Sequence, residues 1–314
     1  MILSLKPVKK HIRSTTPLET CILLTVRSAL PFKTFILLTN ALWHIPDIAN
    51  ICYNDRILYR KPREPQKQMS YETEKLIEEL DRYFAREDLA GAGAFLEAQR
   101  EQACLSGDWQ RELTLANEQL GFYRRVNREG AAMEAVERAI RLIEDHKELA
   151  EVTVGTVCLN AATTLKAFGR QDRAMPLYSR ALHAYEQSLS PGDYRFAGLY
   201  NNMAGAYQDA GEFDRAEHCY QKAIHILSGL KDREPDIAVT YVNLAQLYFA
   251  VDELSPAVYD CMENAQRYLD LQGVPRDENY AYSCRKCAPV FDFFGYFSYK
   301  KELTERADRI YAGN

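Results

Sequence analysis

The sequence predicts an all-α fold, in which antiparallel helix pairs stack into a solenoid. Two observations lead to this prediction. Small and apolar residues recur with a period of 41–42 residues, which is typical of stacked supersecondary units. Within each period, apolar residues follow the spacings of three and four that are typical of helices, and no strand-like alternation persists after residue 69.

Composition and charge restrict the class of protein. The chain has 314 residues, of which 47% are hydrophobic and 26% charged, as in soluble globular proteins. Residues 1–68 hold eleven Lys/Arg and four Asp/Glu, about +7, whereas residues 69–314 hold 28 and 40, about −12. An acidic main body argues against nucleic-acid binding, which needs clustered positive charge. The eight scattered cysteines indicate reduced thiols and a cytoplasmic protein.

The first 68 residues differ from the rest, and we expect a basic, non-globular extension there. They contain no glycine and six of the twelve prolines. Arg27, Pro31 and Lys33 interrupt their most apolar part, CILLTVRSALPFKTFILLTNALW, so we expect no membrane span. We favour the hypothesis that Met69 is the true translation start; a disordered or membrane-surface arm is the alternative.

The helical region begins directly after Met69 and is expected to fill residues 69–314. SYETEKLIEELDRYF opens with Ser70 as a predicted helix cap and Glu72 in the first turn. The clearest helix pairs are predicted at about 113–147, 155–189, 197–230 and 238–271, with looser terminal pairs at 70–105 and 278–312. A looser match is expected at the ends, because terminal units face water on one side.

The copy at residues 197–230 defines the repeat. Its series is Ala204, Tyr207, Gly211, Ala216, Tyr220 and Ala223, and shifts of 41 or 42 residues reproduce its small or apolar character in the other copies. The turn residue is Asn127, Gly169, Gly211 or Asp252, residue types that tolerate a left-handed backbone. The alanines mark close helix contacts, where a larger side chain would overpack by about 1–3 kcal/mol.

The repeat resembles the tetratricopeptide repeat family, in the long version seen in kinesin light chains. LYNNMAGAYQDAGEFDRAEHCYQKAI and EPDIAVTYVNLAQLY carry the resemblance, which extends from about Cys104 to Leu271. It implies a right-handed superhelical solenoid with a concave groove. The implied function is a non-catalytic scaffold or adaptor for protein or peptide partners.

Three asparagines recur in register with the repeat. Asn160, Asn202 and Asn243 follow one another at distances of 42 and 41 residues, although asparagine is a mediocre helix former. In the family that this chain resembles, asparagines at the matching place hydrogen-bond to the backbone of a bound extended peptide. The resemblance implies the same role here, with groove neighbours Thr163, Lys166, Gly205, Gln208 and Gln246, and with Arg124 and Arg125 at one end. The alternative is an asparagine ladder that only ties adjacent repeats together.

One departure from the family narrows the expected ligand. Family members that hold a C-terminal carboxylate use paired lysines and arginines beside the asparagines. Gly198, Val239 and Val242 occupy the corresponding places, so we do not expect a carboxylate clamp.

The sequence carries no signature of an enzyme, metal site or cofactor site. It lacks a phosphate-binding GxxxxGK[ST] loop, HExxH and GxSxG. Cys284 and Cys287 lack the further ligands of a zinc site and the βαβ surround of a redox pair, so we interpret them as packing residues. A thiol redox role at this pair is a minor alternative.

Two further hypotheses concern partners. Most of the aromatic run VFDFFGYFSYKK is expected in the core of the last helix pair, and its excess could form a homo-oligomer contact or a groove wall. The main functional prediction is a scaffold that binds an extended peptide or a disordered segment. The alternative is a peptide-sensing regulator whose superhelix changes shape on ligand binding.

Overall fold

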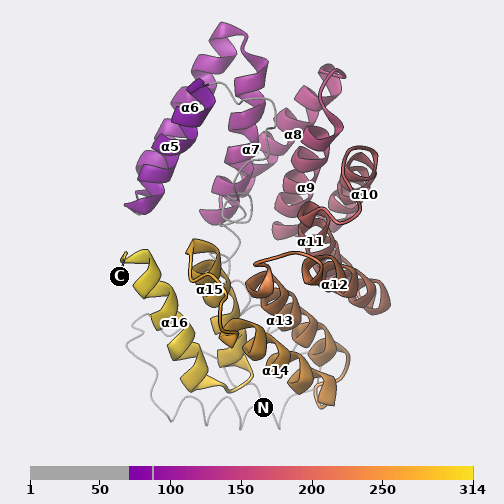
Figure 1. The fold of residues 1–314 in the computed structure, drawn as a ribbon. Helices are drawn as coiled ribbons and strands as arrows, with labels where there is room; N and C mark the ends of the chain where they lie inside the picture. Colours follow the sequence, from indigo (N-terminus) through magenta and orange to yellow (C-terminus); the bar gives the residue numbers. More distant parts are fainter. Residues whose placement is uncertain (1–70, 87, 314) are drawn as a thin grey trace, which may run out of the picture. The chain divides into compact units, whose positions relative to one another are not determined.

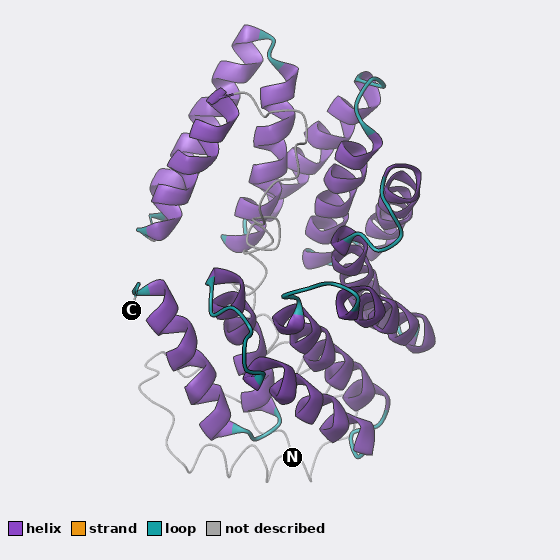
Figure 2. Ribbon diagram, viewed as in Figure 1, coloured by secondary structure: helices purple, strands orange, loops and turns teal. Residues whose placement is uncertain are grey.

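The computed structural model describes residues 71–86 and 88–313, all of which belong to one compact unit. This described part contains helices joined by loops and turns, and no strand (Figure 2). The all-α prediction is therefore confirmed for it. The predictions for residues 1–68, including the start at Met69, lie outside the described residues.

Twelve helices follow one another in the described residues (Figure 1). They are α5 (Tyr71–Ala85), α6 (Leu89–Ser106), α7 (Trp109–Arg125), α8 (Glu129–Asp145), α9 (Glu151–Ala167), α10 (Gln171–Ser188), α11 (Tyr194–Asp209), α12 (Phe213–Ser228), α13 (Glu234–Val251), α14 (Pro256–Asp270), α15 (Glu278–Phe293) and α16 (Phe297–Tyr311). The odd-numbered member of each consecutive pair is called the first helix below, and the even-numbered member the second helix.

The helices pack as consecutive pairs. Each first helix contacts the second helix that follows it, and α6, α8, α10 and α12 contact the first helix of the next pair. First helices also contact one another, from α7 to α9, α11, α13 and α15 in turn. This arrangement is the predicted solenoid of helix pairs.

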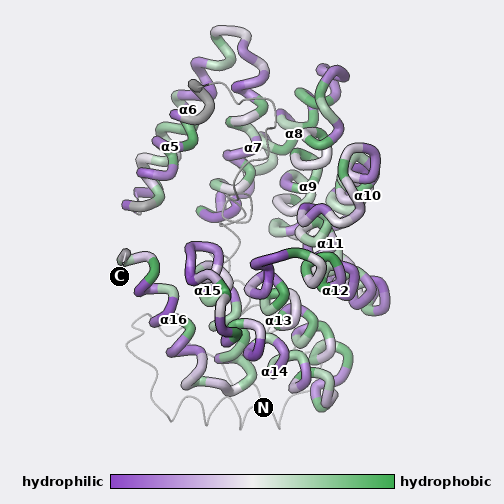
Figure 3. Tube along the Cα trace, viewed as in Figure 1, coloured by the Kyte–Doolittle hydropathy of each residue, from purple (hydrophilic) through white to green (hydrophobic). Residues whose placement is uncertain are grey.

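The small residues of the repeat lie where the helices meet. Ala204, Ala216 and Ala223 are fully buried, and Tyr178 and Tyr220 fill the space between neighbouring helices. Apolar and hydrophilic segments alternate along each helix, because one side of the helix packs and the other meets water (Figure 3).

Three of the four predicted turn residues adopt the left-handed backbone. Asn127, Gly169 and Gly211 have φ values of 52°, 71° and 76°. Asp252 does not: its φ is −149°, so the prediction was wrong there. The connection from α13 to α14 is one residue longer than the other three, and the Asp252 side chain stabilises it by accepting the Leu254 N–H at 3.0 Å.

In the four clearest pairs, the first helices α7, α9, α11 and α13 begin three or four residues earlier than the approximate predicted ranges. For example, α11 begins at Tyr194, because Asp193 caps it by accepting the backbone N–H of Arg195 at 2.9 Å. None of the helices in residues 71–86 and 88–313 is long and apolar enough to cross a membrane.

Candidate interaction surface on the first helices

Two of the three predicted asparagines connect consecutive first helices. Asn160 Nδ2 on α9 donates to Asn117 Oδ1 on α7 at 2.9 Å, and Asn243 Nδ2 on α13 lies 3.4 Å from Asn201 Oδ1 on α11. Asn202 instead donates to the carbonyl of Gly198 in its own helix at 2.9 Å. The first two contacts join adjacent repeats, as expected for the alternative interpretation of an asparagine ladder. All three predicted residues are half-buried.

An ion pair crosses from α9 to α11, between Lys166 and Asp209. Lys166 Nζ lies 3.0 Å from Asp209 Oδ2. Lys166 can lie along α11 because residue 205 is glycine: a Cβ there would come within 3.2 Å of Lys166 Nζ. Gly205 and Lys166, both predicted groove residues, are thus in contact.

The two predicted glutamines differ in their contacts. Gln208 Oε1 lies 3.5 Å from the hydroxyl of Tyr220, which belongs to α12. Burial raises the pKa of Tyr220, with Asp209 adding to the shift, so this hydroxyl stays protonated and can donate. Gln246 is half-buried on α13.

Two of the predicted groove residues are buried. Thr163 is buried, because its side of α9 faces α10: its hydroxyl donates to the Leu159 carbonyl at 2.8 Å and lies 3.4 Å from the Tyr178 hydroxyl. Arg124 is also buried, so its guanidinium is not an exposed charge at the end of a groove. Arg125 is half-buried and lies 5.4 Å from the centroid of the Phe84 ring.

Sequence reasoning missed several residues of this surface. Asn117 precedes Asn160 by 43 residues, and this near-repeat spacing could have identified it. Asp209 follows Gly205 by four residues and therefore shares its side of α11, a signal that was also present in the sequence. These contacting residues, together with Gly121 one turn after Asn117, are named the first-helix face: Asn117, Gly121, Asn160, Lys166, Gly198, Asn202, Gly205, Asp209 and Asn243.

Two glycines of the first-helix face border open space. Among the described residues, a Cβ added at Gly121 or at Gly198 would meet no atom within 4 Å. Neither has a positive φ, and both lie inside helices, where glycine costs about 0.5–1 kcal/mol relative to alanine. Internal packing therefore does not explain either glycine. Their backbone is open to close approach by another chain.

The cysteine pair of α15 lies in the core. Cys284 and Cys287 are fully buried and are free thiols. Burial raises the pKa of Cys284 to about 11 and raises that of Cys287 well above its usual value. Because the thiolate is the reactive form, both shifts oppose redox chemistry and agree with the packing interpretation.

The aromatic run divides between core and surface. Phe291 and Tyr299 are buried and pack edge to face, with ring centroids 4.7 Å apart. Phe293 and Phe297 are 57% and 62% exposed, so they form the expected excess. Self-association through this end stays a prediction.

Titratable groups do not converge into a metal centre in the described part of the chain. No group of three or more His, Cys, Asp or Glu side chains there is placed to hold a metal ion.

Comparison with known proteins identifies one repeat segment. The tetratricopeptide repeat model matches residues 195–259, which cover most of α11 to the start of α14. No curated protein matches the sequence.

Solved structures with similar arrangements are distant in sequence. BtubC (BKLC) from P. vanneervenii is 20% identical, over 73% of this chain and 91% of that chain, with a TM-score of 0.49. A putative kinesin light chain with nearly identical TPR-like repeats, from Podosopora anserina, is 20% identical over 62% and 94%, with a TM-score of 0.43.

Proposed function

We propose that this tetratricopeptide-repeat chain is a non-catalytic interaction scaffold, whose first-helix face binds an extended segment of another protein. The observation that carries the proposal is the open backbone at Gly121 and Gly198. Both positions weaken their helices and fill no internal space. A bound chain that approaches closely would account for both glycines.

The spacing of the half-buried asparagines suits an extended ligand. Packed helices lie about 8–10 Å apart, and an extended chain advances about 3.3 Å per residue. Successive first helices could therefore each contact one ligand residue in three. An amide side chain offers both a donor and an acceptor, which match one peptide unit. Asn160, Asn202 and Asn243 each already use at least one of these groups in a hydrogen bond within the protein.

Binding would therefore exchange hydrogen bonds rather than add them freely. The Asn160 and Asn243 amides would keep or replace their contacts to the neighbouring repeat, and a ligand would use the remaining half of each amide. At about 0.5–1.5 kcal/mol net per hydrogen bond, three such contacts give at most about 2–4 kcal/mol. Partner side chains must supply the rest of a useful affinity.

Glycine substitution tests the proposal without removing any protein hydrogen bond. The full chain with Gly198→Leu places a side chain in open space on the first-helix face, and we expect it to fold, because leucine is a better helix former than glycine. Gly130→Leu is the matched control, since Gly130 also borders open space but lies in the first turn of the second helix α8.

The measurement is capture of partners from lysate of the source organism by the full chain and both variants, after circular dichroism has shown equal helicity. We expect the parent and Gly130→Leu to capture the same partner proteins in equal amounts. We expect Gly198→Leu to capture at least tenfold less of them. Equal retention by all three would reject the first-helix face as the binding surface. Compaction of the chain on binding, measured by small-angle scattering, would favour a regulator over a passive scaffold.

A further inference from the structure

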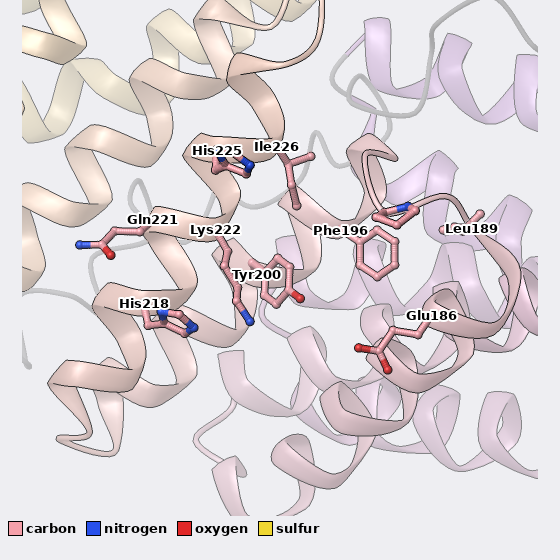
Figure 4. A pocket seen from close by; sticks show the side chains of 10 residues that line it. Glu186, Leu189, Phe196, Tyr200, His218, Gln221, Lys222, His225 and Ile226 are labelled. Carbon is pink, nitrogen blue, oxygen red and sulfur yellow. The ribbon is translucent and has the colours of Figure 1, made fainter.

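A recess lies away from the first-helix face. It has a volume of about 540 Å³ and is formed by the end of α10, the following loop, the first half of α11 and residues 218–226 of α12 (Figure 4). Phe196 and Tyr200 of α11 and Ile226 of α12 form its apolar floor. We call it the outer pocket. Its volume lies in the range of pockets that enclose a ligand group.

The charged residues of the outer pocket stand on opposite walls. Lys222 of α12 extends over Tyr200, with Nζ 5.1 Å from the ring centroid, and Glu186 of α10 lies across from it (Figure 4). Within residues 71–86 and 88–313, neither Lys222 nor Glu186 forms an ion pair. Both are exposed, so their charges can meet an incoming group.

The α12 wall carries further hydrogen-bond donors. His218 and His225 lie four residues before and three residues after Lys222, so all three share the exposed side of the helix. A carboxylate beside this wall could pair with the ammonium of Lys222 and accept from either imidazole. Glu186 is the one acidic side chain among the described residues that line the pocket, and it stands on the opposite wall, so a carboxylate beside α12 can pair with Lys222 there.

We propose that the outer pocket binds an apolar or aromatic side chain of a partner protein that carries a carboxylate on a flanking residue. The apolar side chain would cover Phe196 and Tyr200, as an anchor residue fills a pocket at the centre of an interface. The carboxylate would meet Lys222 at the rim. This site is independent of the proposed function, because none of the residues of the first-helix face lines it.

Three capped tripeptides of defined charge test the proposal on the full chain. Each carries a central phenylalanine, flanked by two glutamates, two glutamines or two lysines. The measurement is the NMR chemical shift of ¹³C-labelled histidine side chains, with His218→Gln and His225→Gln to assign the two signals. We expect the signals of His218 and His225 to move most with the acidic peptide, which should bind about two- to fivefold more tightly than the neutral one.

Four variants, one at Lys222, one at Lys301 and two at Tyr200, locate the peptide-binding site and the charge that selects among the peptides. Lys222→Met keeps the aliphatic stem over Tyr200 and removes the charge, so the preference for the acidic peptide should disappear. Lys301→Met, at an exposed lysine of α16 that is remote from the pocket residues in sequence and does not line it, should retain the preference. Tyr200→Ala removes part of the floor and should weaken all three peptides, whereas Tyr200→Phe should not.

The proposal is overturned if neither histidine signal moves at millimolar peptide. It is also overturned if the three peptides act equally on the parent, or if the basic peptide binds most tightly. Retained acidic preference in Lys222→Met would likewise exclude the assigned role of Lys222.

Discussion

The first-helix face and the outer pocket offer a partner two different kinds of surface. On the first-helix face, polar side chains already contact one another or their own backbone, as in the Lys166–Asp209 and Asn160–Asn117 pairs. In the outer pocket, Lys222 and Glu186 stand beside exposed apolar area without an ion pair in the described residues.

The difference predicts different binding energetics. A ligand on the first-helix face exchanges existing hydrogen bonds, so backbone shape and open space should decide which segment fits. A ligand in the outer pocket covers apolar rings, so it gains from burial, and charge selects among ligands. The two surfaces should also differ in stability: substitutions should matter strongly at the buried ring of the pocket floor and weakly at the half-buried polar residues of the first-helix face.

The largest expected effect is at the pocket floor. Phe196 is buried and packs edge to face against Tyr185, with ring centroids 5.8 Å apart. We expect Phe196→Ala to lower the free energy of unfolding by about 3–5 kcal/mol, measured by urea denaturation of the full chain. Asn202→Ala on the first-helix face should cost less than about 1 kcal/mol, since it loses one hydrogen bond and gains helix propensity. Equal losses would end the distinction between the two surfaces.

A smaller effect is expected at Asp193, which caps α11 beside the pocket. Burial alone would raise the pKa of Asp193, but hydrogen bonds from the side chain and backbone N–H of Arg195 outweigh it and hold the pKa below its ordinary value. Removing the cap in Asp193→Ala should cost about 0.5–2 kcal/mol.

The sign of the pH effect at Asp193 follows from the lowered pKa. Its stabilising contribution is complete above the unfolded pKa of about 3.9 and is lost as the pH falls through the lower native pKa. Urea midpoints measured at a series of pH values should therefore fall less steeply below pH 4 for Asp193→Asn than for the parent. The same substitution at the exposed Asp145 is the control, and identical slopes for both variants would contradict the assignment.

The two glycines of α11 differ in their surroundings: Gly198 borders open space, whereas Gly205 lies against the Lys166 side chain. Gly198→Ala should stabilise the chain by about 0.5–1 kcal/mol, because the added Cβ meets no described atom within 4 Å. Gly205→Ala should gain less, because its Cβ would lie 3.2 Å from Lys166 Nζ and would push that side chain away. Thermal unfolding of both variants measures the contrast, and a larger gain at Gly205 would disprove it.

The smallest expected effect is the coupling across the ion pair of the first-helix face. Lys166 and Asp209 side chains are 27% and 43% exposed, so water screens their interaction. A double-mutant cycle with Lys166→Met and Asp209→Asn should give a coupling free energy of about 0.2–1 kcal/mol that decreases at high salt. A coupling that salt leaves unchanged would indicate a buried contact instead.

Particular residues show how far the sequence predicts this protein. The register of Ala204, Ala216 and Ala223 is local information, because only small residues fit where helices touch, and it predicted the helix pairs correctly. Gly169 and Gly211 predicted left-handed turns for the same local reason. Asp252 failed, because a loop one residue longer lets a side chain, rather than a left-handed backbone, close the turn.

The sequence by itself determined the fold class, the repeat and the helices that carry the polar residues, since these depend on periodicity and on the conformational limits of single residues. Only the tertiary structure decided which side chains meet. It buried Thr163 against α10, joined Lys166 to Asp209 over Gly205, and assembled the outer pocket from α10, α11 and α12. Such contacts depend on how helices from different repeats are placed against one another, and residue spacing within one helix carries no information about that placement.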